Sequence, residues 1–443
     1  MAHQDHTPHG TAALLEVLAR QDLPSADLLG SLTAALRSHC PHCARNLEAA
    51  ARLARKQLRV AGERPRMFAA VSKGVVPADT TLRFEHRRAA KQVAALEELP
   101  WEERLSKIQG LRSRDSSPVL VEALFAASRK ALGTSVAEAG EWLDLAGAHL
   151  SRLRGLAGYS REFLAALSLR LAARRANLLR VASDLPAADE AWKNLRADPR
   201  LARVGNLATH ADLASLEASL RLDQRRLERG AQLIAHAGAI YSFVGDSGGQ
   251  VRVALLQAIQ LRRRGEYSPA LAQLEAAAQI PLTTGEAEHL LVMVGHNRAL
   301  CLALSGQFVA AQEALEGNQA LYKAHRTPES LRLELWLAGR IHSGLGDRDK
   351  ATAALDAARK GFLTSVLSQE AALVTLDLAE LHLHHGHLNQ VQTLARETLS
   401  VFEQQEVPAE AARAIRLLAQ AAVTDRLTQA LVARLRRGLR SYA

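Results

Sequence analysis

The chain has 443 residues, of which 48% are hydrophobic and only 4% aromatic, and its formal net charge is +10. This length can bury a large core, but the runs of Val, Ile, Thr and Tyr that strands favour are nearly missing, so we expect an all-α protein. No apolar run reaches the about 18 residues of a membrane-spanning helix, and no secretory signal pattern opens the chain. We therefore expect a cytoplasmic protein that does not enter a membrane. Its three cysteines are too few for a disulfide framework.

Residues 1–60 are expected to form a small helical head. It contains the stretch "LRSHCPHCARNLEAA", in which His39, Cys40, His42 and Cys43 lie within five positions. A Cys-x-x-Cys pair at the start of a helix can present two thiolates to a tetrahedral zinc ion. The stretch resembles the zinc-binding region of anti-sigma factors, a family whose pattern is His-x-x-x-Cys-x-x-Cys followed by a basic residue and a helix. This chain has Leu36 where that family has its histidine.

Three interpretations of the cysteine motif remain open. In the first, the two cysteines and one of the two histidines bind zinc, and His3, His6 or His9 completes the site, since adjacent residues rarely reach one metal ion together. In the second, the motif is degenerate and keeps the fold of the head without a metal. In the third, the cysteines are a redox pair, although no thioredoxin-like strand pattern surrounds them. The sequence thus predicts either no cofactor or one zinc ion.

The next two segments join the head to the rest of the chain. Residues 61–95 contain Gly, Pro and little periodicity at their start, which predicts a linker followed by a connecting helix. Residues 96–160 are expected to form N-terminal capping helices. Ser117 followed by Pro118 is a strong start signal for one of them, because the hydroxyl can cap free amides and proline suits the first helical position.

A repeat of about forty residues extends over residues 161–425. Each unit has an apolar helical run, a turn, and a second amphipathic helix that opens with small residues. Because neither helix can bury its apolar stripe alone, the units are expected to stack. An alanine five residues after the turn is expected where the two helices of a unit pack closely. The turn residues are Gly265, Gly306, Gly346 and Gly386, spaced by 41, 40 and 40 residues, with Asp184 and Asp223 in the glycine place upstream and Ala270, Ala311 and Ala351 as the small residues.

The turns carry a family resemblance. The stretches from Gly265 to Ala270 and from Gly306 to Ala311 resemble the turn between the helices of a tetratricopeptide repeat. That repeat usually has about 34 residues, so the longer period resembles the helical-pair units of bacterial signalling proteins. The resemblance implies an α-solenoid whose concave groove binds a protein or peptide. Residues 426–443 are expected to add a C-terminal basic helix.

Three residues are predicted to contact the partner. Asn297 lies nine residues before Gly306, a place where tetratricopeptide proteins that clamp peptide carboxylates have a groove asparagine, and Arg298 beside it would supply charge. Asp377 is the polar residue at the equivalent position of a later repeat. Leu256 and Leu337 occupy that position elsewhere, so a complete carboxylate clamp is not predicted.

Other clusters have simpler interpretations. The four histidines of "LHLHHGHL" are predicted to lie in a surface turn rather than to bind a transition metal. Cys301 is expected to be a small buried hydrophobic residue. Basic residues near helix ends are expected to be solvated, and "VGDSGGQ" is expected to be a loop rather than a protease motif. These histidines are His382, His384, His385 and His387, and the basic clusters are Arg262–Arg264 and the tail "ARLRRGLRSYA".

The sequence predicts a binding protein rather than an enzyme. It has no Walker-type phosphate loop, no His-Glu-x-x-His and no Gly-x-Ser-x-Gly. We expect an intracellular scaffold, adaptor or regulatory subunit that holds a protein or peptide in the solenoid groove. The alternative is a transcription-linked regulator that contacts nucleic acid or a sigma-like factor through its basic front third. Residues 1–130 carry 20 Lys and Arg residues against 14 Asp and Glu residues.

Overall fold

The computed structural model describes residues 78–442, apart from 155–160, 183, 205, 283–285, 325–326, 366, 405–408 and 424–427. The predicted head and its four candidate metal ligands, His39, Cys40, His42 and Cys43, lie outside the described residues, as do His3, His6 and His9. The zinc site therefore stays a prediction.

The described residues form helices and contain no strand, so the prediction of an all-α fold is confirmed. Two short 3-10 helices, Ser113–Asp115 and Leu201–Arg203, accompany the α-helices. The α-helices are α5 (Ala78–Glu97), α6 (Trp101–Gln109), α7 (Pro118–Ala131), α8 (Val136–Arg154), α9 (Arg161–Val181), α10 (Leu185–Ala197), α11 (Leu207–Asp223), α12 (Leu227–Val244), α13 (Ser247–Arg263), α14 (Tyr267–Ala278), α15 (Glu286–Leu304), α16 (Phe308–Gly317), α17 (Gln319–Ala324), α18 (Pro328–Gly344), α19 (Arg348–Thr364), α20 (Ser368–His384), α21 (Leu388–Gln404), α22 (Ala409–Val423) and α23 (Gln429–Tyr442).

Consecutive helices pair into stacked hairpins. The pairs are α9 with α10, α11 with α12, α13 with α14, α15 with α16, α18 with α19, and α20 with α21. The first helices of successive pairs also pack against one another, whereas each second helix lies mainly against its own first helix and the next one. The first helices therefore lie on the inner side of a curved solenoid. We call α9, α11, α13, α15, α18 and α20 the inner helices.

Left-handed residues form the turns within the hairpins. Gly265, Gly306, Gly346 and Gly386 have φ angles of 82°, 80°, 82° and 75°, a region in which a Cβ atom is unfavourable. An added Cβ would meet nothing within 4 Å at any of the four. The backbone angle, and not a lack of space, therefore makes glycine suitable at these turns.

The prediction that Asp184 and Asp223 occupy the turn position of the glycines is wrong. Asp223 is the last residue of α11, and the left-handed residue of that turn is Arg225, with a φ of 58°. Asp184 is the N-cap of α10, where its carboxylate accepts a hydrogen bond from the Ala187 amide at 3.0 Å. The period of forty residues stands, because Arg225 precedes Gly265 by forty.

Small residues lie where the two helices pack in the three units for which they were predicted. Ala270, Ala311 and Ala351 are completely buried. In the unit formed by α11 and α12 the equivalent residue is Gly230, where an added Cβ would lie 2.9 Å from the Leu222 Cδ2 atom. The close approach of the paired helices at this position is thus a common feature of the units.

The helices before the repeats pack into the same stack. The second half of the segment predicted as linker and connecting helix forms α5, which packs on α7 and buries Ala89 and Leu96. Ser117 caps α7, as its position before Pro118 predicts, with its hydroxyl 3.3 Å from the Leu120 amide nitrogen.

The stretch "VGDSGGQ" is a helix junction rather than a longer loop. Gly245 ends α12 with a φ of 72°, and the Asp246 side chain caps α13, which begins at Ser247. No helix among the described residues combines the length and the apolar character needed to cross a membrane.

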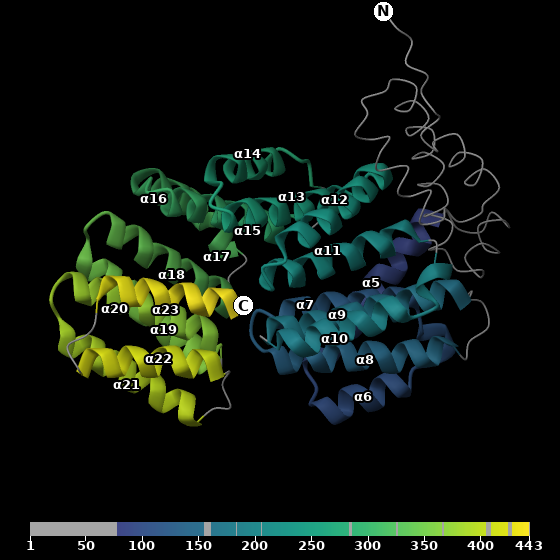
Figure 1. Cartoon of the computed structure of the whole chain (residues 1–443). Helices are drawn as coiled ribbons and strands as arrows, with labels where there is room; N and C mark the ends of the chain where they lie inside the picture. Colours follow the sequence, from purple (N-terminus) through teal and green to yellow (C-terminus); the bar gives the residue numbers. More distant parts are fainter. Residues whose placement is uncertain are drawn as a thin grey trace, which may run out of the picture.

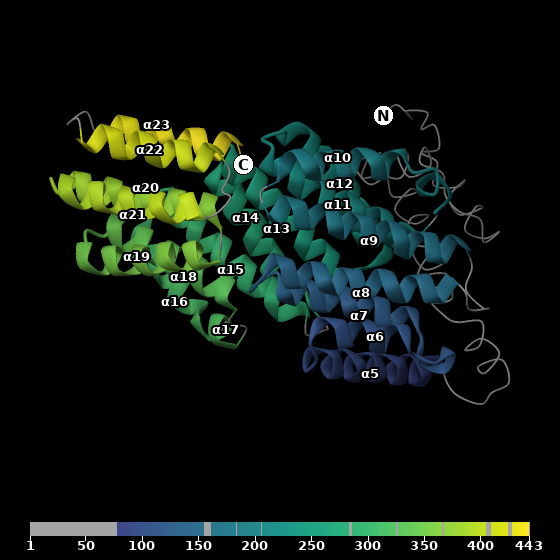
Figure 2. The same cartoon turned by 90° about the horizontal axis from the view of Figure 1, so that it is seen from below.

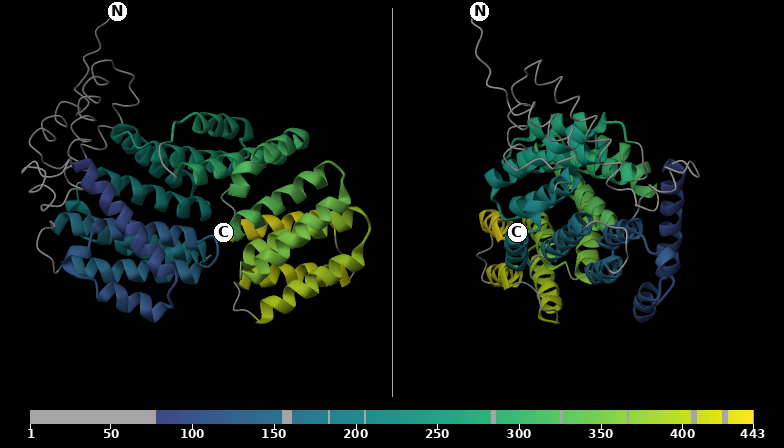
Figure 3. Two further views of the ribbon diagram at one scale, coloured as in Figure 1. Left: turned by 180° about the vertical axis from the view of Figure 1, so that it is seen from behind. Right: turned by 90° about the vertical axis from the view of Figure 1, so that its right-hand side faces the viewer.

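The solenoid bends into an arch. One arm holds α5 to α12, the other holds α16 to α23, and α13 to α15 join the two arms (Figure 1). The view from behind in Figure 3 shows the same two arms. They touch where the Glu329 amide of α18 donates to the Gly133 carbonyl between α7 and α8 at 3.0 Å. The two arms thus meet at the N-terminal end of α18.

The close packing of α18 on α19 yields a first prediction. A Cβ added at Gly339 would lie 2.5 Å from the Leu355 Cγ atom and 3.1 Å from its backbone nitrogen. We expect Gly339→Ala to lower the free energy of unfolding by about 1–3 kcal/mol, measured by urea denaturation. Gly317→Ala is the control, because an added Cβ there meets nothing within 4 Å. Equal losses in both variants would contradict the packing explanation.

Candidate functional site

A cavity of about 670 Å³ lies at the inner side of the C-terminal arm. Its walls come from α15, α18, α19, α20 and α23, and its volume is typical of ligand pockets. We call it the Asp377 cavity. The charged residues that line it are Arg340, Arg348, Asp377, Glu380 and Arg436.

Asp377 is the centre of a buried polar network in this cavity. Its carboxylate accepts hydrogen bonds from Trp336 Nε1 at 2.6 Å and from Arg340 Nε at 2.7 Å, and it lies 2.8 Å from the Arg436 guanidinium of α23. Burial alone would raise the pKa of Asp377, but the two arginines and the hydrogen bonds hold it below its usual value. The Asp377 carboxylate is therefore charged and satisfied by three side chains.

Arg436 corrects the prediction for the basic tail. We expected the tail arginines to be solvated, but the Arg436 side chain is only 18% exposed and also pairs with Glu380. Burial opposes its charge, yet the neighbouring Asp377 and Glu380 carboxylates raise the pKa of Arg436. Arg434 and Arg437 of the same helix are exposed, in agreement with the prediction.

The histidine cluster lies at one edge of the cavity. His384 and His385 are exposed, as expected for a surface turn, and both line the cavity. His382 is instead buried, and burial together with the nearby Arg348 lowers its pKa. His387 accepts a hydrogen bond from Arg348 at 2.8 Å. Among the described residues, no three His, Cys, Asp or Glu side chains are arranged to hold a metal ion.

The structure does not gather the three predicted partner residues into one site. Asn297 is buried in α15, where its amide donates to the Met293 carbonyl one turn earlier at 2.9 Å. Arg298 is exposed on the same helix. Neither residue lines the Asp377 cavity, so only Asp377 of the three belongs to it.

A buried histidine and tyrosine lie beside Asn297. The His296 Nδ1 atom is 2.7 Å from the Tyr322 hydroxyl, and burial, with a smaller effect from Arg262, lowers the pKa of His296 to about 4. Cys301 of the same helix is completely buried, as predicted, and burial raises the pKa of its thiol. These groups stabilise the inner helix and do not point to a reactive site.

Ion pairs also cross the inner helices of the N-terminal arm. The Asp212 carboxylate of α11 lies 3.1 Å from Arg170 of α9 and 3.7 Å from Arg252 of α13. Asp223 at the end of α11 lies 2.6 Å from Arg180 of α9 and 2.6 Å from Arg263 of α13. Each carboxylate thus receives arginines from the inner helices on both sides. We call this arrangement the arginine ladder.

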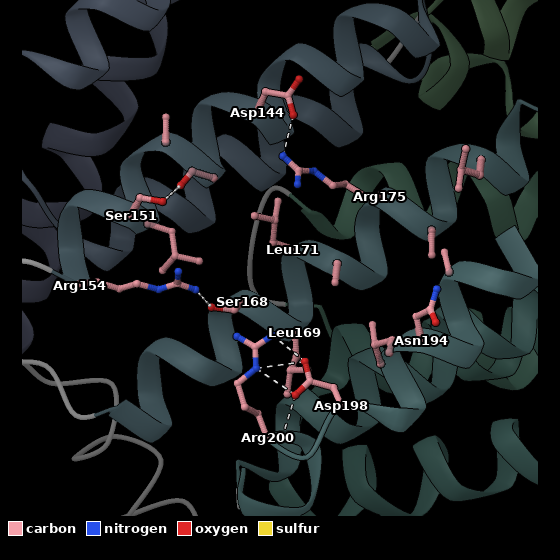
Figure 4. Close-up of a pocket in the computed structure, with 18 residues that line it drawn as sticks. Asp144, Ser151, Arg154, Ser168, Leu169, Leu171, Arg175, Asn194, Asp198 and Arg200 are labelled. Atoms are coloured by element: carbon pink, nitrogen blue, oxygen red, sulfur yellow. Dashed lines mark hydrogen bonds and ion pairs between the residues drawn. The ribbon is translucent and has the colours of Figure 1, made fainter. Parts of the chain in front are cut away.

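A second cavity, of about 680 Å³, lies over α9 between α8 and α10 (Figure 4). Its polar groups pair with one another, as in the contacts of Asp144 with Arg175 at 2.7 Å and Arg154 with Ser168 at 2.9 Å. These pairs are exposed, and exposed pairs contribute little binding or folding energy. We therefore favour the Asp377 cavity, whose charges are buried and come from several helices.

Sequence reasoning missed most of the Asp377 network. Arg340 lies six residues before Gly346, and Glu380 lies six residues before Gly386, so aligning the repeats could have placed both on one face. Arg436 had no such signal, because its partners belong to a helix that is distant in the sequence.

The solved structures that are similar to this chain share little of its sequence. No family model matches the chain, and no curated protein matches it. A solved Rap protein complexed with competence and sporulation factor is 15% identical, with 81% of this chain and 100% of that chain covered and a TM-score of 0.45. The apo form of RapI is 14% identical, with coverage of 71% and 85% and a TM-score of 0.46.

The TPR domain of P58(IPK) is 13% identical, with 95% of this chain and 99% of that chain covered and a TM-score of 0.23. Identities this low transfer no function from one chain to another. The stacked hairpins and left-handed turns of this chain constitute a tetratricopeptide-like helical-repeat fold.

The Asp377 network yields a second prediction. We expect Asp377→Asn to lower the free energy of unfolding by about 3 kcal/mol, because two largely buried arginines lose their shared counter-charge. Urea denaturation at neutral pH measures this effect. The matched control is Asp144→Asn, which breaks an exposed pair and is expected to cost less than about 1 kcal/mol. A cost for Asp377→Asn as small as that of the control would contradict the buried network.

His296 yields a third prediction, on pH. Its pKa of about 4 in the folded chain lies below the ordinary value of 6.5, so the unfolded chain takes up the proton first. The stability that neutral His296 provides is complete above about pH 6.5 and is lost as the pH falls towards 4, by up to about 3 kcal/mol. Urea denaturation between pH 7 and 4 should show a shallower loss for His296→Gln than for the unmodified chain or for His385→Gln. Parallel curves for all three would refute this role.

Proposed function

We propose that this protein is an adaptor or regulatory subunit that binds a protein or peptide partner on the inner side of its solenoid, at the Asp377 cavity. The cavity itself is the observation that carries the proposal. It combines side chains of both charges from several helices with a volume that can receive a few side chains of a partner. Pre-shaped grooves with a few anchor residues are the usual way in which helical repeats bind.

The chemistry of the cavity supports a peptide rather than a small apolar ligand. Glu380 is 42% exposed, so its carboxylate can also accept hydrogen bonds from a partner. Arg348 carries donors suited to a carboxylate or a backbone carbonyl. Trp336 lies under the Arg340 guanidinium at 4.8 Å and stiffens this wall. A partner with both acidic and basic groups matches such a surface.

The observations favour the groove over the nucleic-acid alternative. Arginines in the front helices are engaged within the fold: Arg152 donates to the Gln109 and Leu111 carbonyls, and Arg104 donates to the Leu99 carbonyl at 2.7 Å. Arg170 belongs to the arginine ladder. A contact through residues 1–77 would lie outside the described residues and stays a prediction.

Affinity purification of the full chain from its own cells tests this function. We expect Arg348→Glu to lower the recovery of a specific partner at least tenfold, because it reverses a charge in the cavity wall. Lys360→Glu, on the exposed side of α19, is the matched control and should retain the partner. Arg298→Glu reports whether the site extends along α15.

Full recovery of the same partner by Arg348→Glu would overturn the proposal. Far-ultraviolet circular dichroism of each variant establishes that a loss of recovery does not come from a loss of folding.

A further inference from the structure

The C-terminal helix α23 departs from the repeat pattern. In the earlier hairpins the second helix packs closely on its own first helix, whereas α23 packs mainly on α20. A cavity of about 550 Å³ lies between α22 and α23, lined by Leu417 and Gln420 on one side and by Leu431 and Arg434 on the other. Figures 1 and 2 show α23 at the end of the C-terminal arm, with its last turn at the middle of the arch. Its attachment to α22 is therefore loose.

The contacts of α23 with α20 are specific. Val432 and Leu439 are buried in the apolar cluster that contains the inner face of α20. Arg436 contacts Asp377, Glu380 and the Leu376 carbonyl. Gln429, seven residues earlier, lies 3.0 Å from His384, seven residues after Asp377. The two helices thus run antiparallel, with matched polar and apolar contacts.

Comparison with the arginine ladder shows what α23 contributes to α20. Asp212 and Asp223 each receive arginines from the inner helices before and after their own. Asp377 receives Arg340 from the preceding inner helix α18, but its second arginine comes from α23. The inner face of α20 therefore presents a carboxylate that accepts an arginine from a neighbouring helix, and here α23, which packs on α20 beside α22, supplies that arginine.

We propose that this inner face of α20 is a docking surface for a basic amphipathic helix, that α23 occupies it in the unbound chain, and that a helix of this kind from a partner protein displaces α23. The proposal deepens the proposed function and rests on it. Asp377 and Glu380 supply the charge that selects an arginine, and the apolar cluster that buries Val432 and Leu439 selects the amphipathic form.

A labelled peptide with the sequence of residues 429–442 tests the surface in the full chain. Fluorescence anisotropy measures its binding. We expect the Arg436→Gln chain to bind the peptide at least tenfold more tightly than the unmodified chain, because its own α23 competes less well. Adding Glu380→Gln to that chain should weaken binding again.

Matched peptides separate the specific contact from general charge. A peptide with Arg436→Gln should bind at least tenfold more weakly to the Arg436→Gln chain. A peptide with Arg434→Gln should bind as the unmodified peptide does, because Arg434 is exposed in the structure. If the Arg436→Gln chain does not fold, Arg436→Lys replaces it, with the same order of affinities expected.

Three results would overturn the proposal. They are equal binding of the peptide by the chains with and without Arg436→Gln, equal binding of the two altered peptides, and a dimer of the unmodified chain that the peptide dissociates in light scattering. The last result would assign the surface to α23 of a second copy.

Failure of this test is distinguishable from failure of the proposed function. The peptide experiment needs no cellular partner. If the peptide does not bind while Arg348→Glu still loses its partner, partner binding at the Asp377 cavity is retained as the function and the proposed displacement of α23 is rejected.

Discussion

The fold depends on the burial of apolar stripes between stacked hairpins. No single hairpin can cover its own stripe, and the buried apolar residues accordingly form a succession of clusters along the chain rather than one central core. The paired helices of several units approach closely because a small residue lies five positions after the turn, as at Ala270 and Ala311. Stability is therefore distributed, and each unit needs its neighbours.

Buried ion pairs restrict which helices of this stack can lie next to one another. Burying an arginine and a carboxylate costs free energy that their attraction only partly offsets, so such pairs are weak evidence for stability. Their geometry, however, restricts which helices can lie side by side. Asp212 fits between α9 and α13 because each of these helices brings an arginine to it. The same rule at Asp377 brings α23 onto α20 and creates the wall of a cavity.

The Asp377 cavity is built from α15 and from helices of the C-terminal arm. The hydrogen bond between Glu329 and Gly133 joins the two arms across most of the solenoid. The predicted partner residues Asn297 and Arg298 lie on α15, away from the Asp377 cavity. Asp377 is the one predicted partner residue in that cavity.

The sequence by itself determined the helical class, the period near forty residues, the glycine turns and the small residues of the hairpins, because these depend on local backbone angles and on spacing within one unit. It misplaced the turn at Asp223, since Arg225 adopts a left-handed angle that usually marks glycine. Only the tertiary structure decided that Arg436 is buried against Asp377 and that the arms meet at Gly133. These contacts join residues that are far apart along the chain, and no local pattern records the curvature that brings them together.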